Sequence, residues 1–290
     1  MSVAISGAGG QLGRLASEYL LERLSPSDVI LVTRDTGALA DFAARGAQIR
    51  HGDFDQPDTL PSAFAGAERL LIISTADLGR RVPQHKNAVD AAVKAGVEHV
   101  AYTSVPNPTP ENPAMVVGEH SATEQAIEDS GLAWTMLRMG LYSEFQIPGG
   151  ANAVASGRLV HNAGDGRTAY ISRADCAAAA GAWLATGGHE GVAFTVTGPE
   201  LLSQADVAGL LSETTGRPVE AVPVSDEEFT AGLVAAGVPE AIAPGYATWG
   251  QAIRKGALNA QTTVVQDLTG RAPRSLRDVL TDHRDALLGS

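Results

Sequence analysis

The feature that most constrains the fold is a glycine-rich segment between a short apolar strand and an amphipathic helix, near the start of the chain. Residues 3–6 read Val-Ala-Ile-Ser, and the next seven read Gly-Ala-Gly-Gly-Gln-Leu-Gly. A helical stripe follows, formed by Leu12, Leu15, Tyr19, Leu20 and Leu24. A strand, a glycine turn and a helix in this order are typical of a dinucleotide-binding βαβ unit.

Each glycine of this segment answers a different steric need. Gly7 permits a tight turn, Gly10 lets backbone N–H groups approach a pyrophosphate, and Gly13 lets the helix lie close to the strand. The unpaired N–H groups and the helix dipole favour an anion there. The sequence therefore predicts a phosphate site made by Gly7, Gly9, Gly10, Gln11, Leu12 and Gly13. The alternative is a tight turn that needs glycine for its backbone angles and binds nothing.

Apolar runs of strand length alternate with helical stretches over the first two hundred residues. The strands are predicted at residues 3–6, 29–33, 48–51, 70–74, 99–103, 134–138 and 194–196. Crossover helices are predicted between them, with Gly96 and Gly131 as C-caps of two. This alternation predicts an α/β protein with a Rossmann-type, doubly wound parallel sheet.

The regular alternation weakens after residue 142, so we expect a smaller C-terminal lobe that binds substrate. We place the NADP-binding domain at 1–145, completed by about 165–198, and the lobe at 146–164 and 199–290. Residues 148–150 (Pro-Gly-Gly) and 162–166 are expected to be loops. A helix is predicted over 203–214, with Ser203 as its N-cap.

Composition narrows the function classes. The formal net charge of −12 disfavours binding to nucleic acid, and no apolar run is long enough to cross a membrane. Cys176 is the only cysteine, which excludes an internal disulfide and leaves no cysteine cluster for zinc, so no metal is expected. The apolar strand follows Met1 almost at once, which leaves no room for a secretory leader and points to the cytoplasm.

The end of the second strand bears on the choice between NAD and NADP. An acidic residue would bind the ribose 2′-hydroxyl of NAD there, but the chain reads Leu31-Val32-Thr33-Arg34. The Arg34 guanidinium can pair with a 2′-phosphate, which favours NADP(H) as the cofactor. The alternative is a solvated arginine paired with Asp35, and that carboxylate leaves NAD open.

Several further segments resemble the atypical NmrA-like branch of the short-chain dehydrogenase/reductase superfamily, and most closely its bacterial quinone and triphenylmethane reductases. They are the Gly-x-x-Gly-x-x-Gly spacing, residues 81–92, 101–104, 137–144 and 164–167, and Arg173-Ala174-Asp175. The resemblance implies that Asp53 and Phe54 flank the adenine. It also implies that Ser74, Thr75, Thr103 and Ser104 approach the ribose and nicotinamide. Each could instead be an ordinary polar residue that ends a strand.

The chain departs from the superfamily pattern at two places. The Tyr-x-x-x-Lys pair is absent, and His120 and Glu124 stand on the fifth crossover helix with i, i+4 spacing. His120 is a candidate proton donor whose charged form the carboxylate would favour, or else half of a solvated surface pair. Met139-Gly140 replaces the Asn-Gly of the reductases it resembles, which predicts a more apolar acceptor pocket near Tyr142 and Phe145.

Two functions remain open at this stage. The first is an NADPH-dependent reductase that passes hydride to an electrophilic small molecule such as a quinone, with His120 and Tyr142 as the candidate catalytic residues. The second is a non-catalytic NADP(H)-binding redox sensor of the NmrA type. The missing Tyr-Lys pair is compatible with both, and the absence of a segment that looks like a docking element favours the reductase. A homodimer is the oligomer we would test for.

Overall fold

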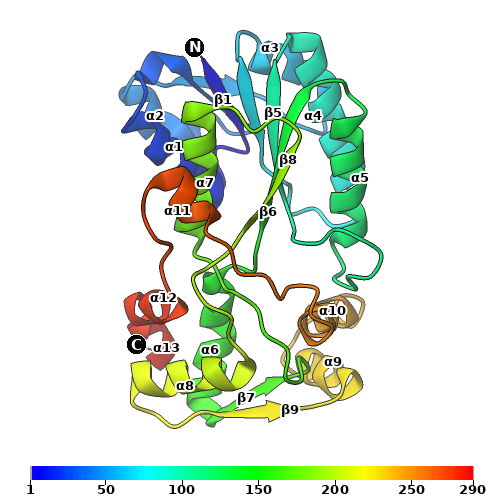
Figure 1. The fold of residues 1–290 in the computed structure, drawn as a ribbon, viewed down its shortest axis with the longest axis vertical. Coiled ribbons are helices and arrows are strands. Elements are labelled where there is room, and N and C mark those ends of the chain that lie inside the picture. Colours follow the sequence, from blue (N-terminus) through cyan, green and yellow to red (C-terminus); the bar gives the residue numbers. More distant parts are fainter. Residues whose placement is uncertain (1, 290) are drawn as a thin grey trace.

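The computed structural model describes residues 2–289, and the upper part of the molecule in Figure 1 is a seven-stranded sheet in which all paired strands are parallel. The strand order is β3-β2-β1-β4-β5-β6-β8. The strands are β1 (Val3–Ser6), β2 (Val29–Thr33), β3 (Gln48–His51), β4 (Arg69–Ile72), β5 (His99–Ser104), β6 (Ala133–Met139) and β8 (Val192–Val196). The order reverses between β1 and β4, which confirms the predicted doubly wound Rossmann-type fold.

Helices cover both faces of this sheet (Figure 1). One face carries α1 (Gln11–Leu21), α7 (Arg173–Thr186) and α11 (Val264–Thr269), and the other carries α3 (Leu60–Phe64), α4 (Arg81–Ala95) and α5 (Val117–Glu128). A short helix, α2 (Ala40–Ala44), and the 3-10 turns η1 (Pro26–Asp28), η2 (Gly37–Leu39) and η3 (Pro57–Thr59) lie in the connections. Because both faces are covered, β1, β2, β4 and β5 are buried along their whole length.

The first turn of α1 lies directly against the end of β1. Gly7 adopts a left-handed conformation with φ of 75°, which an L side chain rarely takes. A Cβ on Gly13 would lie 2.3 Å from the Gly7 carbonyl oxygen and 2.7 Å from the Ala8 Cα. Only glycine at position 13 therefore lets the helix start this close to the strand, as the sequence predicted.

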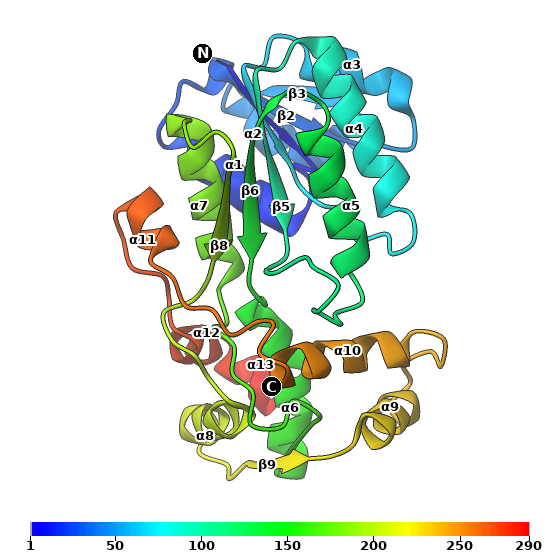
Figure 2. The same ribbon diagram turned by 45° about the vertical axis from the view of Figure 1, so that its right-hand side comes forward.

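The lower part of the molecule is a mainly helical lobe (Figures 1 and 2). It contains a two-stranded parallel sheet that the sequence did not reveal, β7 (Arg158–His161) and β9 (Glu220–Pro223). Its helices are α6 (Gln146–Ser156), α8 (Gln204–Thr215), α9 (Asp226–Ala235), α10 (Ala243–Arg254), α12 (Leu276–Asp282) and α13 (Arg284–Leu288). A separate hydrophobic core joins α6, α8, α12 and α13.

The prediction of a loop at residues 148–150 is wrong, because these residues lie inside α6. Pro148 is the third residue of the helix, where its missing N–H would have no intrahelical partner. A Cβ on Gly150 would lie 2.9 Å from Leu287 Cδ2 and 3.0 Å from Leu211 Cδ2. The glycine thus allows close packing of α6 against α8 and α13, a tertiary requirement that local sequence does not show.

Gly96 is the C-cap of α4 as predicted, but the C-cap of α5 is Asp129 and not Gly131. Two other local predictions are confirmed. Ser203 caps α8 through a reciprocal capping box with Asp206, and Cys176 is fully buried in the core. Among the described residues, no helix is both long and apolar enough to span a bilayer. The helix α11 comes from the C-terminal third of the chain but packs on α7 of the sheet half, with Val265 in that core.

Replacement of Gly13 by alanine should destabilise the fold, because the methyl group would overlap the backbone of the β1–α1 turn. We expect a loss of about 3 kcal/mol in the free energy of unfolding, measured by urea denaturation. Gly209→Ala is the matched control, since a Cβ on Gly209 in the middle of α8 meets nothing within 4 Å. That change should stabilise by about 0.5–1 kcal/mol. Equal effects at the two positions would contradict the close approach.

Candidate functional site

The turn between β1 and α1 forms an anion cradle made of backbone. Gly10 is the N-cap of α1, and in the described part of the chain no side-chain cap bond meets the first N–H groups of the helix. No acidic residue occupies the first turn. A Cβ on Gly10 would meet only the Gly7 carbonyl oxygen, at 3.4 Å, so the space beside this backbone is open to a ligand. The exposed Gly9, Gly10 and Gln11 and the buried Leu12 complete the segment.

The end of β2 lies next to this cradle, because β1 and β2 are neighbours in the sheet. Arg34 is exposed, and among the described residues no ion pair or hydrogen bond engages its side chain. Its neighbour Asp35 instead accepts a bond from the Gly37 N–H at 3.0 Å. The sequence alternative of an Arg34–Asp35 pair is therefore not what the structure shows. Arg34 is available for an anion.

The end of β3 provides the next group. Asp53 is half-buried and accepts hydrogen bonds from the Asp55 N–H at 3.0 Å and from Gln56 Nε2 at 3.2 Å. Phe54 is half-buried and lies edge-on to the His85 ring, with ring centroids 6.3 Å apart. Its carbonyl accepts a bond from Asn87 Nδ2 at 2.8 Å. The adenine role of Asp53 and Phe54 stays a prediction.

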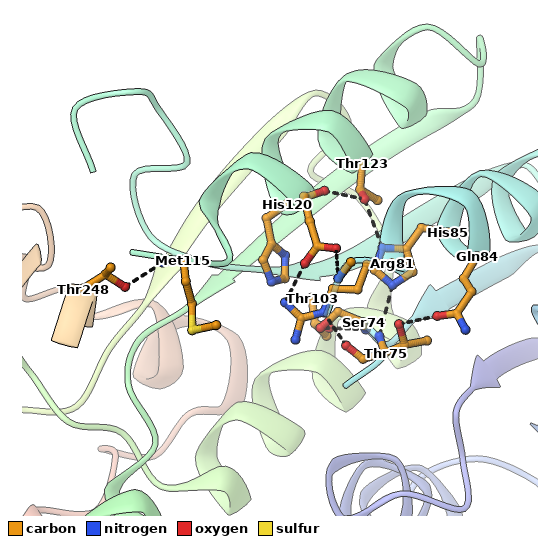
Figure 3. Close-up of polar contacts among 12 residues, drawn as sticks. Ser74, Thr75, Arg81, Gln84, His85, Thr103, Met115, His120, Thr123 and Thr248 are labelled. Atoms are coloured by element: carbon orange, nitrogen blue, oxygen red, sulfur yellow. Dashed lines mark hydrogen bonds and ion pairs between the residues drawn. The ribbon is translucent and has the colours of Figure 1, made fainter. Parts of the chain in front are cut away.

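The ends of β4 and β5 are tied together by polar side chains (Figure 3). Thr103 Oγ1 accepts from the Ser74 N–H at 2.9 Å and donates to Ser74 Oγ at 3.2 Å. Thr75 Oγ1 donates to Gln84 Oε1 at 2.7 Å. Ser104 Oγ is buried without a hydrogen-bond partner in the described part of the chain, as is Arg81 Nη1. Orphaned buried polar atoms at the carboxyl edge of a parallel sheet are what a bound ligand would satisfy.

The expectations for His120 and Glu124 need correction. Both side chains are buried, and Glu124 forms a bidentate pair with Arg138, with its Oε2 2.6 Å from Nη2. The carboxylate therefore does not favour a charged His120. Burial and the nearby Arg81 cation instead lower the pKa of His120 to about 3. The imidazole is neutral near pH 7, so neither a cationic proton donor nor a solvated surface pair describes it.

Sequence reasoning missed three residues beside His120. Tyr102 is fully buried, and its hydroxyl lies 2.8 Å from His120 Nδ1 and 3.3 Å from His85 Nδ1. Burial lowers the pKa of His85 to about 4 and raises the pKa of the Tyr102 hydroxyl. Arg81 Nε donates to the Thr75 carbonyl at 2.6 Å. Tyr102 lies inside the predicted strand 99–103 and was given no role there. A tyrosine inside a buried strand needs a polar partner, and that was the available signal.

Tyr142 and Phe145 lie where the sheet half meets the lobe. Phe145, in the 3-10 turn η4 (Ser143–Phe145), is 59% exposed, and its ring centroid is 5.4 Å from that of Tyr142. The Arg173 guanidinium carbon lies 4.8 Å from the centre of the Tyr142 ring. The Tyr142 hydroxyl donates to Met139 Sδ at 3.6 Å. Because a thioether accepts weakly, Met139 makes this corner less polar than an asparagine would.

The comparisons with known proteins agree with this geometry. Residues 7–186 match a family model described as NAD(P)H-binding. Quinone oxidoreductase 2 of Escherichia coli is 34% identical over 95% of this chain and 96% of its own. The chain belongs to the NmrA-like NAD(P)H-binding oxidoreductases.

Two solved structures of similar oxidoreductases cover nearly the whole fold. The NADPH complex of an Escherichia coli NADPH-dependent quinone oxidoreductase superposes with a TM-score of 0.93, at 33% identity over 97% of this chain and 99% of that one. The Citrobacter triphenylmethane reductase bound to NADP(H) superposes with a TM-score of 0.88, at 34% identity over 97% and 99%. The lobe of this oxidoreductase is thus shared with them and is not a separate addition.

Replacement of Gly10 by valine should abolish NAD(P)H binding while leaving the oxidoreductase folded. Gly10 has φ of −76°, which valine tolerates, and its Cβ would make only one contact of 3.4 Å. The branched side chain would fill the space beside the backbone N–H groups. Calorimetric titration with NADPH measures the effect, and thermal unfolding checks the fold. Unchanged affinity in a folded variant would refute the phosphate cradle.

The buried imidazole of His120 should make stability fall in acid. Its pKa is about 6.5 in the unfolded chain and about 3 in the folded one, so only the unfolded state gains a proton between these values. Stability is therefore unaffected above pH 6.5 and falls below it. Between pH 7 and pH 5, this one group should lower the free energy of unfolding by about 2 kcal/mol.

Urea denaturation of the parent and of His120→Gln at the two pH values tests this prediction. The loss of stability on acidification should be about 2 kcal/mol smaller in the variant. His51→Gln is the matched control, because it removes an exposed imidazole. An identical acid dependence in the parent and His120→Gln would show that the His120 site admits the charged ring.

Proposed function

We propose that this oxidoreductase reduces an electrophilic small molecule, with a quinone as the representative acceptor, and uses NADPH as the reductant. NADPH supplies the hydride. The observation that carries the proposal is the carboxyl edge of the sheet. Open backbone N–H groups follow β1 there, Arg34 follows β2 without a side-chain partner among the described residues, and the unpartnered, buried Ser104 Oγ lies at the end of β5. Similarity over almost the full length to reductases whose names state a quinone or a triphenylmethane substrate supports the acceptor class.

In this proposal the chain binds and orients the reactants. The β1–α1 cradle holds the pyrophosphate, Arg34 pairs with the 2′-phosphate, and Asp53 and Phe54 flank the adenine. Ser74, Thr75, Thr103 and Ser104 face the ribose and nicotinamide. Tyr142, Phe145 and the lobe form the wall that receives the acceptor and excludes water. Tyr142 is neutral at physiological pH, because burial raises the pKa of its hydroxyl.

The acceptor class follows from what His120 can do. A neutral imidazole at physiological pH is a poor general acid, and the Tyr-Lys pair that would replace it is absent. A quinone needs little acid catalysis, because the anion formed when hydride adds is stabilised by aromatic delocalisation and can be protonated by water. The regulator alternative is not favoured, since two relatives that span the chain at 34% and 32% identity are named as oxidoreductases.

Consumption of NADPH against a panel of acceptors tests the function. We expect turnover with quinones and cationic triphenylmethane dyes, and much slower reaction with simple aldehydes, whose alkoxide product needs a proton. Gly10→Val protein prepared in the same way is the control for contaminating reductases. Tight NADPH binding without turnover on any acceptor would refute the reductase and favour the sensor.

Loss of Arg34 should weaken NADPH binding far more than NADH binding. A charge-assisted contact to the 2′-phosphate contributes about 1.5–3 kcal/mol, so Arg34→Ala should raise the Kd for NADPH about tenfold to a hundredfold. Arg45→Ala is the matched control, because Arg45 pairs with Glu18 at 2.5 Å. Calorimetry of the parent and both variants with NADPH and NADH measures the six affinities. Equal losses for NADPH and NADH would assign Arg34 a structural role.

A further inference from the structure

A chain of buried polar groups runs from the end of β4 to His120 on α5. The Thr75 N–H donates to His85 Nε2 at 3.0 Å. His85 Nδ1 lies 3.0 Å from Thr123 Oγ1 and 3.3 Å from the Tyr102 hydroxyl, which in turn lies 2.8 Å from His120 Nδ1. His85, Tyr102, His120 and Thr123 are each at most 4% exposed. Figure 3 shows both histidines facing the Ser74, Thr75, Thr103 and Arg81 group.

The first link fixes the tautomer of His85. A backbone N–H can only donate, so His85 Nε2 must accept and carries no proton. Since burial lowers the pKa of His85 to about 4, the ring is neutral at physiological pH and its proton lies on Nδ1. That N–H points at Thr123 Oγ1 and the Tyr102 oxygen. The Thr123 hydroxyl donates its own hydrogen bond to the Glu119 carbonyl oxygen, 2.8 Å away, so Thr123 Oγ1 is free to accept from His85.

The second link fixes His120. The Tyr102 oxygen faces the N–H of His85, so its own proton turns to His120 Nδ1, the shorter of its two imidazole contacts. His120 Nδ1 then accepts, and the proton of the neutral ring lies on Nε2. Within the described chain, Nε2 has no hydrogen-bond partner. The unpartnered polar atoms that are fully enclosed do not include Nε2, so this atom is accessible from outside. It is therefore an N–H open to a ligand.

The surrounding charges keep both rings neutral. The Arg81 cation at the start of α4 lowers the pKa of both rings, and its Nη1 lies 3.6 Å from Glu119 Oε2. Glu119 is also engaged by the Gly79 N–H at 2.8 Å. Glu124 is neutralised by Arg138 from β6. No carboxylate among the described residues hydrogen-bonds to either ring, so nothing offsets the effect of Arg81 and burial.

We propose that Thr75, His85 and Tyr102 hold His120 as the Nε2–H tautomer, and that this N–H donates a hydrogen bond to the acceptor oxygen that becomes negative during reduction. This rests on the proposed function. Hydride addition gives a quinone two electrons and one hydrogen and leaves a hydroquinone monoanion, whose second proton comes from water. His120 keeps its proton throughout and is the catalytic residue. His85 and Tyr102 are positioning residues that act through it.

The tautomers can be read directly, without turnover. Nitrogen-15 spectra of histidine-labelled protein distinguish Nδ1–H, Nε2–H and the imidazolium, and His85→Gln and His120→Gln variants assign the two rings. We expect Nδ1–H at His85 and Nε2–H at His120 from pH 5 to 9, with and without NADP⁺. In Tyr102→Phe, His120 should become a mixture of tautomers. An Nδ1–H or imidazolium form of His120 at pH 7 in the parent would overturn the proposal.

Steady-state kinetics then test whether the His120 Nε2–H bonds to the acceptor during reduction. With a benzoquinone acceptor, His120→Ala and Tyr102→Phe should each lower kcat about three- to tenfold, the worth of one hydrogen bond, with the KM for NADPH unchanged. The loss in His120→Ala should not vary from pH 5 to 9, because no proton is transferred. A loss of a hundredfold with a limb titrating near pH 6.5 would instead make His120 a general acid.

A matched control distinguishes loss of the Tyr102 hydrogen bond from the general effect of removing a buried tyrosine hydroxyl. Tyr170→Phe also removes a buried tyrosine hydroxyl, one that accepts from Gln204 Nε2 at 2.9 Å in the lobe core. It should leave kcat and the His120 tautomer unchanged. If kcat and the His120 tautomer in Tyr102→Phe were like those of the parent, the proposed role of the hydrogen-bonded groups would be refuted. Absence of turnover in the parent, with the expected tautomers, would refute the proposed function but leave the tautomer assignment standing.

Discussion

The contact between the first turn of α1 and the end of β1 determines where the anion cradle of the candidate site lies. The helix begins so close to the strand that a Cβ at Gly13 would be 2.3 Å from the Gly7 carbonyl oxygen. This contact points the free N–H groups of α1 across the carboxyl edge of the sheet. The strand order then places β4 and β5 on the other side of the same edge, so polar residues at their ends face one ligand space.

A second constraint is the burial of a polar chain between α4, β5 and α5. Burying polar groups without partners would cost several kcal/mol, but here each group except His120 Nε2 is met by a donor or an acceptor. The result is that two histidines lose their charge and each keeps one tautomer. In this oxidoreductase, burial therefore converts the residue type best suited to proton transfer into a fixed hydrogen-bond donor.

Hydrogen bonds and an ion pair connect the lobe to the sheet half, in addition to the covalent backbone. Thr248 Oγ1 of α10 accepts the Met115 N–H at 2.9 Å, in the loop that leads into α5 (Figure 3). Fully buried Asp175, at the start of α7, accepts from Arg271 Nη1 at 2.6 Å and from the Arg274 N–H at 2.8 Å. These contacts connect α10 to the loop before α5, and the segment between α11 and α12 to the start of α7.

The sequence by itself determined the parallel sheet, the glycine turn and Arg34 at the end of β2, because strand periodicity, positive φ and a missing acidic residue are all local properties. It did not determine the state of His120. The spacing of His120 and Glu124 correctly put both on one helix. In the structure, however, Arg138 of β6 forms an ion pair with Glu124, and Arg81 of α4 lowers the pKa of His120.

The lobe gives a second case that the sequence alone did not determine. Local propensity predicts a loop at Pro148-Gly149-Gly150, but these residues are helical in the structure. Leu211 and Leu287 decide that outcome by packing where a Cβ of Gly150 would lie. Only the tertiary structure could decide these points, because a pKa and a close helix contact depend on residues that are distant along the chain and adjacent in space.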